Sequence, residues 1–226
     1  MSVAEAIIRD TVVDALTSQL RTDILGGLYP PGSSLPPERE LAAQYQVTRT
    51  SLKHAFVRLA QAGLVETKHG VGTRVLDYER FGGPELLPML VRTVGPAWME
   101  EIFAVRLEVG SLIAAQAARH STAEDRARLR ELLAELGTAA DAQLVESEIH
   151  RMIAAATGNR VYGFLVNSML NAYLEIRGLF QHAFADPEAA AARIAPLIEA
   201  IESGDPEAAH AASYSYLTTT RELMLG

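Results

Sequence analysis

The chain has 226 residues, of which 49% are hydrophobic and 21% are charged, and its formal net charge is −8. This length allows two domains that each have a hydrophobic core. Cysteine is absent, which excludes disulfides, thiolate metal sites and cysteine nucleophiles. No apolar run reaches the roughly 18 residues of a membrane span, and the N-terminus lacks a signal-peptide layout. We therefore expect a cytoplasmic protein without a membrane partner.

The charge is distributed unevenly along the chain. Residues 1–76 carry eight Lys and Arg against seven Asp and Glu, whereas residues 77–226 carry 12 against 21. Within residues 39–74 the count is six basic residues against two acidic ones. An acidic protein can still bind DNA when its cations are concentrated on one module. The distribution therefore points to a nucleic-acid-binding module in the N-terminal third.

The first predicted element is an amphipathic helix over residues 3–25. Four apolar residues recur in it at roughly helical spacing: Ile7, Val12, Leu16 and Leu20. We expect this helix to pack beneath the elements that follow it, as the first helix of the same module.

Two helices separated by a tight turn are predicted next. Residues 38–45 form a short helical run after two prolines, which are tolerated at helix starts. Residues 46–47 make the turn. Thr48 can cap the second helix, because its hydroxyl can accept a hydrogen bond from a free backbone N–H. Gly63 is placed to end that helix.

The second of these helices has two different faces. The apolar face, expected to lie in the core, consists of Leu52, Phe56 and Leu59. Another face, near the N-terminal end, carries Arg49, Thr50 and Lys53. In helix-turn-helix proteins this end of the second helix meets the base edges of DNA. For isolated cations the alternative is an ordinary solvated helix face.

A β-hairpin is predicted after Gly63. Two β-prone runs, 64–68 and 73–76, flank the sequence HGVG at 69–72. Glycine at the tip lets the backbone approach a partner closely, and Lys68 and His69 are placed to contact phosphates or a minor groove. A helix, a turn, a cationic helix and a hairpin in this order predict a winged helix-turn-helix that binds double-stranded DNA.

These motifs resemble the GntR family of bacterial transcription regulators. The matching segments are LYPPG at 28–32, LPPERELA at 35–42, VTRTSLKHAFVRLAQAGLV at 47–65 and HGVGT at 69–73. The resemblance implies that Arg39, Arg49, Lys53, His69 and Gly70 contact DNA. Together with the positions argued above, the expected DNA contacts are Arg39, Thr48, Arg49, Thr50, Lys53, Lys68, His69 and Gly70.

The chain departs from that family at two of these positions. The family usually has Arg where this chain has Lys53, and lysine lacks the bidentate fork that reads guanine. The family usually has glycine where this chain has Gln46, which predicts a slightly strained turn.

The rest of the chain is predicted to be helical. The breaker GGP at 82–84 leads us to place a DNA-binding domain at 1–76, a linker at 77–84 and a second domain at 85–226. Helices are expected over 85–94, 97–119, 123–136, 139–156, 160–183, 188–202 and 206–224. The fold class is therefore mainly α, with a winged helix-turn-helix followed by an all-α bundle of six or seven helices.

Several of these helices have recognisable starts. The segment STAE at 121–124 reads as a capping box in which Ser121 and Glu124 are the reciprocal partners. The pairs Asp186-Pro187 and Asp205-Pro206 each read as an N-cap followed by proline at the first helical position.

The second domain resembles the ligand-binding helical domain of the FadR subgroup of the same family. The match is good at ESEIHRMIAAATGNRVYGFLVNSML (146–170) and at AFADPEA (183–189), and the latter is similar to the fatty-acid-responsive members. Many members hold a divalent metal with one Asp and three His. Glu146 and His150 match the first pair, but Ile194 and Tyr216 occupy the other two positions. We therefore expect no metal cofactor, with Glu146 and His150 as a residual partial site.

The resemblance also implies an effector pocket. Fatty-acid-responsive members lack the metal and bind long-chain acyl-CoA, and the expected effector-binding residues here are Arg106, His150, Tyr173 and Tyr216. A buried arginine pairs with a carboxylate or phosphate, and tyrosine can line an apolar channel while donating a hydrogen bond. An acyl tunnel could be formed by Met152, Phe164, Leu165, Met169 and Leu170, although these residues could equally fill the bundle core.

The sequence thus predicts a homodimeric regulator that binds a pseudo-palindromic operator and responds to a fatty acyl-CoA or fatty-acid-like effector. The alternative effector is a small organic carboxylate, with or without a divalent metal. Two further alternatives are a ligand-independent DNA-binder whose helical domain only dimerises and an enzyme with a DNA-binding appendage. The sequence shows no Ser/His/Asp arrangement and no phosphate-binding glycine loop that would favour an enzyme.

Overall fold

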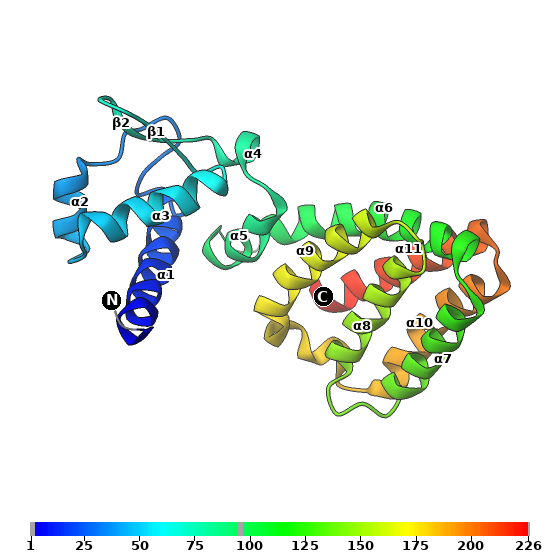
Figure 1. Ribbon diagram of the computed structural model, residues 1–226. Coiled ribbons are helices and arrows are strands. Elements are labelled where there is room, and N and C mark those ends of the chain that lie inside the picture. The colour runs from blue at the N-terminus through cyan, green and yellow to red at the C-terminus, as the bar shows by residue number, and fades with distance from the viewer. Residues whose placement is uncertain (1–2, 95–96, 226) are drawn as a thin grey trace. The chain divides into compact units, whose positions relative to one another are not determined.

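The computed structural model describes residues 3–94 and 97–225, with side chains over 12–93 and 98–225 (Figure 1). The chain divides into two compact units, residues 1–94 and 95–226. The division follows Val94, later than the linker expected at 77–84, so the expected second domain at 85–226 begins too early. The reason is that helix α5 (Leu87–Val94) packs against α1 (Val3–Leu25) and buries Met89 and Leu90 in the first unit.

The N-terminal unit is a winged helix-turn-helix, as expected. Its elements after α1 are α2 (Glu38–Gln44), α3 (Arg49–Gln61), β1 (Val65–Lys68), β2 (Gly72–Val75), α4 (Tyr78–Phe81), a 3-10 turn at Pro84–Leu86 and α5. The two strands form an antiparallel hairpin in which Val65 lies opposite Val75 and Lys68 lies opposite Gly72. The hairpin tip is therefore one residue shorter than the expected connection over 69–72.

The core of this unit lies between α1 and α3, which pack against each other. The expected apolar face of α3 is buried, and so are Leu16 and Leu20 of α1. The expectation for Val12 was wrong: its side chain is 38% exposed, whereas that of Val13 is 3% exposed. The face of α1 that meets α3 is thus set by Val13, Leu16 and Leu20, and the side chain of Ile7 lies outside the described residues.

The turn between α2 and α3 has the conformation that its residues predicted. Thr48 is the N-cap of α3, and its hydroxyl accepts a hydrogen bond of 3.1 Å from the Ser51 N–H. Gln46 has a φ of 54°, which no other non-glycine residue of the described chain approaches. A side chain in this left-handed region costs energy, because Cβ crowds the backbone. Gly63 follows α3 with a φ of 69° and ends it without that cost.

The second unit is an all-helical bundle. Its elements are α6 (Ala97–His120), α7 (Ala123–Leu136), α8 (Ala142–Ala155), α9 (Arg160–Ile176), the 3-10 segment η2 (Arg177–Phe184), α10 (Pro187–Ser203) and α11 (Pro206–Leu225). Helices α6 and α11 lie side by side along much of their length, and α8 packs between α7 and α9 (Figure 1). No helix among residues 3–94 and 97–225 is long and apolar enough to cross a membrane.

The expected single helix over 160–183 is interrupted. Helix α9 ends at Ile176, and Phe180 inside η2 has non-helical backbone angles. Gln143 of α8 donates a 2.9 Å hydrogen bond to the Arg177 carbonyl, which is thereby satisfied from outside the helix. Phe180 stacks on Tyr173, with ring centroids 6.1 Å apart, so side-chain packing stabilises the break.

Helix starts in this unit are capped by short polar side chains. Asp186 and Asp205 accept hydrogen bonds from backbone N–H groups, as expected. The predicted capping box was off by one residue: the reciprocal pair is Thr122 with Asp125, not Ser121 with Glu124. Both pairs have suitable side chains, and only the point where the helix begins distinguishes them.

Candidate functional site

The expected DNA contacts all lie on the surface of the N-terminal unit. Each of these eight residues is exposed: Arg39, Thr48, Arg49, Thr50, Lys53, Lys68, His69 and Gly70. Helix α3 presents Arg49 and Lys53 one turn apart at its N-terminal end, with side chains 64% and 63% exposed. The geometry is that of a helix whose first two turns can enter a major groove.

The two cations at the N-terminal end of α3 contact one carboxylate, that of Glu38, which was not among the expected site residues. The Oε2 atom of Glu38, in the first turn of α2, lies 3.5 Å from Arg49 Nη2 and 3.9 Å from Lys53 Nζ. The only signal in the sequence was an acidic residue at a helix start, which usually serves the helix dipole. Nothing in the spacing of Glu38 and Arg49 indicates that they meet across the turn.

The wing offers mainly backbone and one apolar side chain at its tip. Gly70 and Gly72 have φ values of 76° and 115°, and Val71 between them is 82% exposed. Lys68 pairs with Glu66 at 3.1 Å, and Arg74 donates to the Gly32 carbonyl at 3.2 Å. Arg74 therefore stabilises the base of the wing. At the tip, residues 69–71, the described part of the chain shows one internal hydrogen bond, 3.1 Å from the Val71 N–H to the Lys68 carbonyl.

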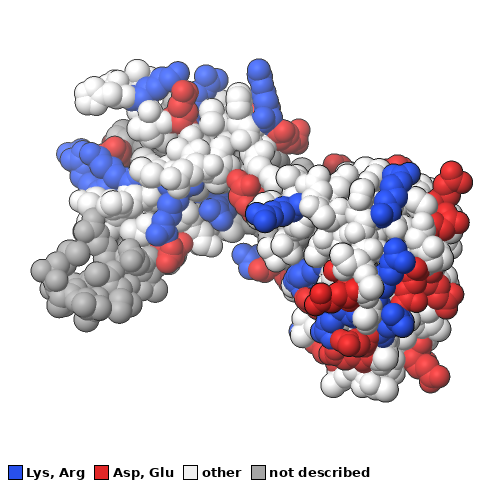
Figure 2. Space-filling model, turned by 45° about the vertical axis from the view of Figure 1, so that its right-hand side comes forward, with Lys and Arg blue, Asp and Glu red and all other residues white. Residues whose placement is uncertain are grey.

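The helical unit, residues 95–226, has a net negative charge. Figure 2 shows acidic side chains interspersed with basic ones on the surface of this unit, and residues 95–226 carry 18 acidic against 10 basic residues. A negatively charged surface repels the DNA backbone. The charge distribution therefore favours the basic segment over residues 39–74 as the part of the chain that contacts DNA.

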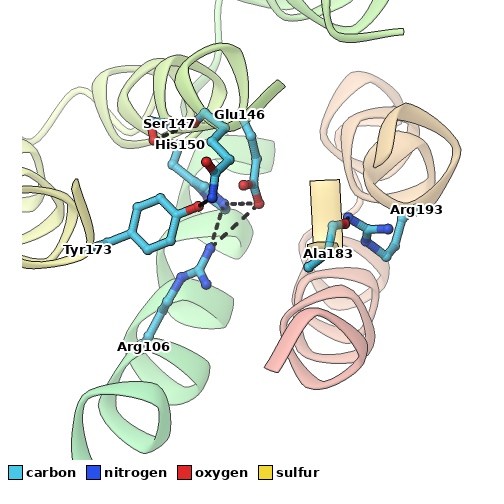
Figure 3. Close-up of polar contacts among 8 residues, drawn as sticks. Arg106, Glu146, Ser147, His150, Tyr173, Ala183 and Arg193 are labelled. Atoms are coloured by element: carbon cyan, nitrogen blue, oxygen red, sulfur yellow. Dashed lines mark hydrogen bonds and ion pairs between the residues drawn. The ribbon is translucent and has the colours of Figure 1, made fainter. Parts of the chain in front are cut away.

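A polar centre lies inside the helical unit, built from α6 and α8 (Figure 3). Arg106 Nη2 lies 3.0 Å from His150 Nε2 and 3.7 Å from Glu146 Oε1. Glu146 and His150 are four residues apart on α8, which places both side chains on one face. The Glu146 side chain is 3% exposed and its Oε1 atom has no hydrogen-bond partner.

Burial determines the charge of this centre. It lowers the pKa of His150, and the positive charge of Arg106 acts in the same direction, while Glu146 opposes both. The carboxylate of Glu146 offsets the charge of Arg106. The three side chains together are therefore close to electroneutral at neutral pH.

Two tyrosines, Tyr173 and Tyr216, lie near this centre. The Tyr173 hydroxyl accepts a 2.7 Å hydrogen bond from Gln143, and burial raises the pKa of this tyrosine. The Tyr216 ring lies 5.8 Å from that of His150, and its buried hydroxyl has no hydrogen-bond partner. Thr220, one turn further along α11, also has a buried hydroxyl without a partner. Gln143 was not expected at the site, because it meets Tyr173, 30 residues away, only in the folded bundle.

A small cavity of about 40 Å³ adjoins the polar centre. Its wall is formed by Arg106, Val109, Gly110, Ile113, Ala114, His150, Ile153, Val166, Met169, Leu170, Leu197, Ser213 and Leu217. We call it the Arg106 cavity. Of the four expected effector residues, Arg106 and His150 line it, whereas Tyr173 and Tyr216 border the polar centre without reaching its wall.

The expected acyl tunnel is corrected by the structure. Met169 and Leu170 line the Arg106 cavity, but Phe164 and Leu165 are 72% and 38% exposed and Met152 is not part of the wall. Helix α9 points those two side chains outward, so apolar character in the sequence did not imply burial here. Glu146 and His150, the residual partial metal site, are both in contact with Arg106, which is not a metal ligand. No group of three potential metal ligands comes together within residues 12–93 and 98–225.

Known families match both units. The model described as "Bacterial regulatory proteins, gntR family" matches residues 12–75, and the model described as "FCD domain" matches residues 101–219. The first match covers the winged helix-turn-helix, and the second covers the helical bundle with the Arg106 cavity.

Individual relatives agree with these matches. The chain is 34% identical over 215 residues to an uncharacterised helix-turn-helix transcriptional regulator of Mycobacterium tuberculosis. This alignment covers 94% of this chain and 89% of the relative. It is 33% identical over 164 residues to the fatty acid metabolism regulator protein of Pasteurella multocida, and this alignment covers 71% of this chain and 67% of the relative. A solved structure of Streptococcus agalactiae GntR is similar with a TM-score of 0.52 at 25% identity, covering 93% of this chain and 99% of that one. The chain therefore belongs to the gntR family of bacterial regulatory proteins with a FadR-like, C-terminal FCD domain, and it is a DNA-binding transcription regulator rather than an enzyme.

Proposed function

We propose that this regulator senses a fatty acyl ligand, most favourably an acyl thioester such as acyl-CoA, and that the ligand alters its binding to operator DNA. The observation that carries the proposal is the wall of the Arg106 cavity, where Arg106, His150 and Ser213 interrupt an otherwise apolar lining. A ligand with an apolar chain and one hydrogen-bond acceptor matches such a wall. The relative from Pasteurella multocida that is named a fatty acid metabolism regulator supports the same ligand class.

The charges at the cavity favour an uncharged acceptor over a carboxylate. Glu146 already offsets the charge of Arg106, and the lowered pKa of His150 means that this ring adds no positive charge at neutral pH. A free carboxylate would bring a second negative charge beside the buried Glu146, which is costly in a region of low dielectric. A thioester carbonyl can accept a hydrogen bond from Arg106 without adding charge.

The size of the cavity supports a second candidate. A volume of about 40 Å³ accommodates roughly three water molecules. A long acyl chain therefore requires side chains to move. Among the described helices of the second unit, α9 is the least buried: Leu170 and Ala172 are buried, whereas Val161 and Phe164 are 59% and 72% exposed. A small organic carboxylate would need less movement, but it would have to displace or protonate Glu146.

We further propose a metal-free homodimer that acts in the cytoplasm on a pseudo-palindromic operator. A two-fold symmetric protein places two recognition helices on two half-sites. The effector can change operator binding only if its affinity differs between the conformation that fits DNA and the one that does not. The two units are joined in the chain after Val94, and we expect the change to be transmitted through this junction.

Native mass spectrometry of the purified protein tests assembly, metal content and co-purified ligand together. We expect a dimer without metal. Calorimetric titration with dodecanoyl-CoA, dodecanoate and succinate then ranks the head groups, and we expect the thioester to bind most tightly. The variant Arg106→Met should weaken thioester binding, whereas Arg130→Met, which removes a 63% exposed cation of α7, should not.

Other outcomes identify the alternatives. Tighter binding of succinate than of the thioester would support the small-carboxylate candidate. One metal ion per chain would contradict a metal-free site. Binding of none of the three compounds, with operator binding intact, would indicate that the helical unit has only a structural role.

A further inference from the structure

We propose that Glu38 is a specificity-determining residue for DNA binding, because it positions Arg49 and restrains Lys53 at the start of the recognition helix. A single carboxylate oxygen, Oε2, lies within 3.5 Å of Arg49 Nη2 and 3.9 Å of Lys53 Nζ. The inference rests on α3 being the recognition helix, and it concerns how that helix distinguishes operator from other DNA.

The position of Glu38 offsets the positive charge at the N-terminal end of α3. Arg49 is the first residue of this helix, and the first turn contains no acidic residue. The N-terminal end of a helix carries a partial positive charge, so Arg49 and Lys53 add to a charge of the same sign. Glu38 supplies the missing negative charge from α2, across the turn at Gln46.

The contact leaves Arg49 able to read a base. A guanidinium group has five N–H donors in a fixed plane, and the contact to Glu38 uses only Nη2. The remaining donors can reach a guanine edge while the carboxylate holds the plane of the group. A side chain that is already oriented loses less conformational freedom when it binds.

The same carboxylate opposes contacts that carry no sequence information. Non-specific affinity comes from cations that neutralise phosphates. Glu38 is 29% exposed, lies beside both cations and would itself be repelled by phosphates. It therefore weakens binding to any DNA sequence, and this loss is recovered only where Arg49 makes its oriented contact with a base.

Glu40 provides a matched control. It lies in the same first turn of α2, is exposed, and makes no ion pair among the described residues. Glu38→Gln and Glu40→Gln each remove one negative charge from the start of the same helix. Only the first removes the contact with Arg49 and Lys53.

The test measures two affinities for the full-length protein and both variants. One duplex is selected by the wild-type protein from a random library, and the other is a scrambled duplex of the same composition. In fluorescence anisotropy at constant salt, we expect Glu38→Gln to bind the scrambled duplex about two- to fivefold more tightly. We expect its ratio of specific to non-specific affinity to fall about tenfold, which is the scale of one well-oriented base contact. Glu40→Gln should strengthen both affinities by similar factors and leave the ratio unchanged.

Three outcomes separate the possibilities. A ratio for Glu38→Gln within twofold of wild type, or equal to that of Glu40→Gln, would overturn the inference. If Glu38→Gln unfolds at a lower temperature than Glu40→Gln, the variant Glu38→Asp distinguishes an electrostatic role from a structural one. Restoration of the ratio of specific to non-specific affinity by this shorter carboxylate would require an electrostatic role. If Arg49→Ala does not weaken binding to the selected duplex, the assignment of α3 itself fails, and this result is distinct from failure of the inference on Glu38.

Discussion

Arg106 Nη2 lies 3.0 Å from His150 Nε2, a contact between α6 and α8 in the centre of the helical unit. Arginine has only donors, so this hydrogen bond requires an unprotonated Nε2. His150 is therefore neutral, with its proton on Nδ1. This tautomer leaves Glu146 Oε1, 3.5 Å from the same ring nitrogen, without a donor from His150, in agreement with the absence of a hydrogen bond to that oxygen.

A neutral, buried His150 makes stability depend on pH. Its pKa is lowered below the ordinary value of 6.5. As the pH falls through about 6.5, the unfolded chain takes up a proton at this residue before the folded protein does, so the free energy of unfolding decreases. The stabilisation is fully present above that pH and is lost below it. We expect the melting temperature of wild type to fall more between pH 7.5 and pH 5 than that of His150→Gln.

The exposed His210 of α11 provides the control for this measurement. His210→Gln should retain the pH dependence of wild type, because this side chain lies on the surface and outside the buried centre of Arg106, Glu146 and His150. Equal pH dependence of wild type and His150→Gln would show that His150 is not held neutral.

The pair of Arg106 and Glu146 predicts a strong energetic coupling. Arg106→Met leaves the Glu146 carboxylate buried without a counter-ion, and we expect a loss of about 3 kcal/mol in the free energy of unfolding. The double variant Arg106→Met, Glu146→Leu removes both charges and should recover more than about 1 kcal/mol of that loss. Chemical denaturation of the wild type, both single variants and the double variant measures the coupling. Additive effects would mean that the two side chains do not act as a pair.

Local signals explain how much of the fold could be predicted from the sequence. The cap at Thr48, the stop at Gly63 and the cap at Asp186 each act within about four residues along the chain. Such signals can be read without knowledge of the tertiary structure. The break of the expected helix over 160–183 had no local signal of this kind, because it depends on Gln143, which is distant in the sequence.

The contacts within the two candidate sites join residues that are far apart. Arg106 and His150 are separated by 44 positions, and Glu38 and Arg49 by 11 across a turn. The resemblance identified Glu146 and His150 as a pair, but it implied a metal fragment rather than a pair bound to an arginine of another helix. Apolar character alone also misplaced Phe164 and Leu165, which were expected in an acyl tunnel or in the core, since a helix with little covering can leave apolar side chains exposed.

The turn between α2 and α3 predicts a stabilising substitution. Gln46 has a φ of 54°, a conformation that glycine adopts at less cost. We expect Gln46→Gly to increase the stability of the N-terminal unit by about 0.5–1 kcal/mol, as the relief of strain exceeds the added flexibility of the unfolded chain. Hydrogen exchange of α3 amides in the full-length protein measures this, and protection should increase. Gln44→Gly, within α2, should have the opposite effect, because glycine is unfavourable in a helix. Decreased protection in both variants would contradict the strain at Gln46.

Removal of the Arg49 side chain tests the DNA-binding face directly. Arg49 is 64% exposed at the first position of α3, where a base or phosphate contact is expected. Arg49→Ala should therefore weaken binding to a selected operator duplex by about 1–3 kcal/mol without lowering the melting temperature. The control is Arg58→Ala on the same helix. Arg58 pairs with Asp14 of α1 and lies about two and a half turns from the end of α3 that meets DNA in this fold. Titration of both variants against the same duplex compares them, and an equal loss of affinity would show that cations of α3 act only through the overall charge of the helix.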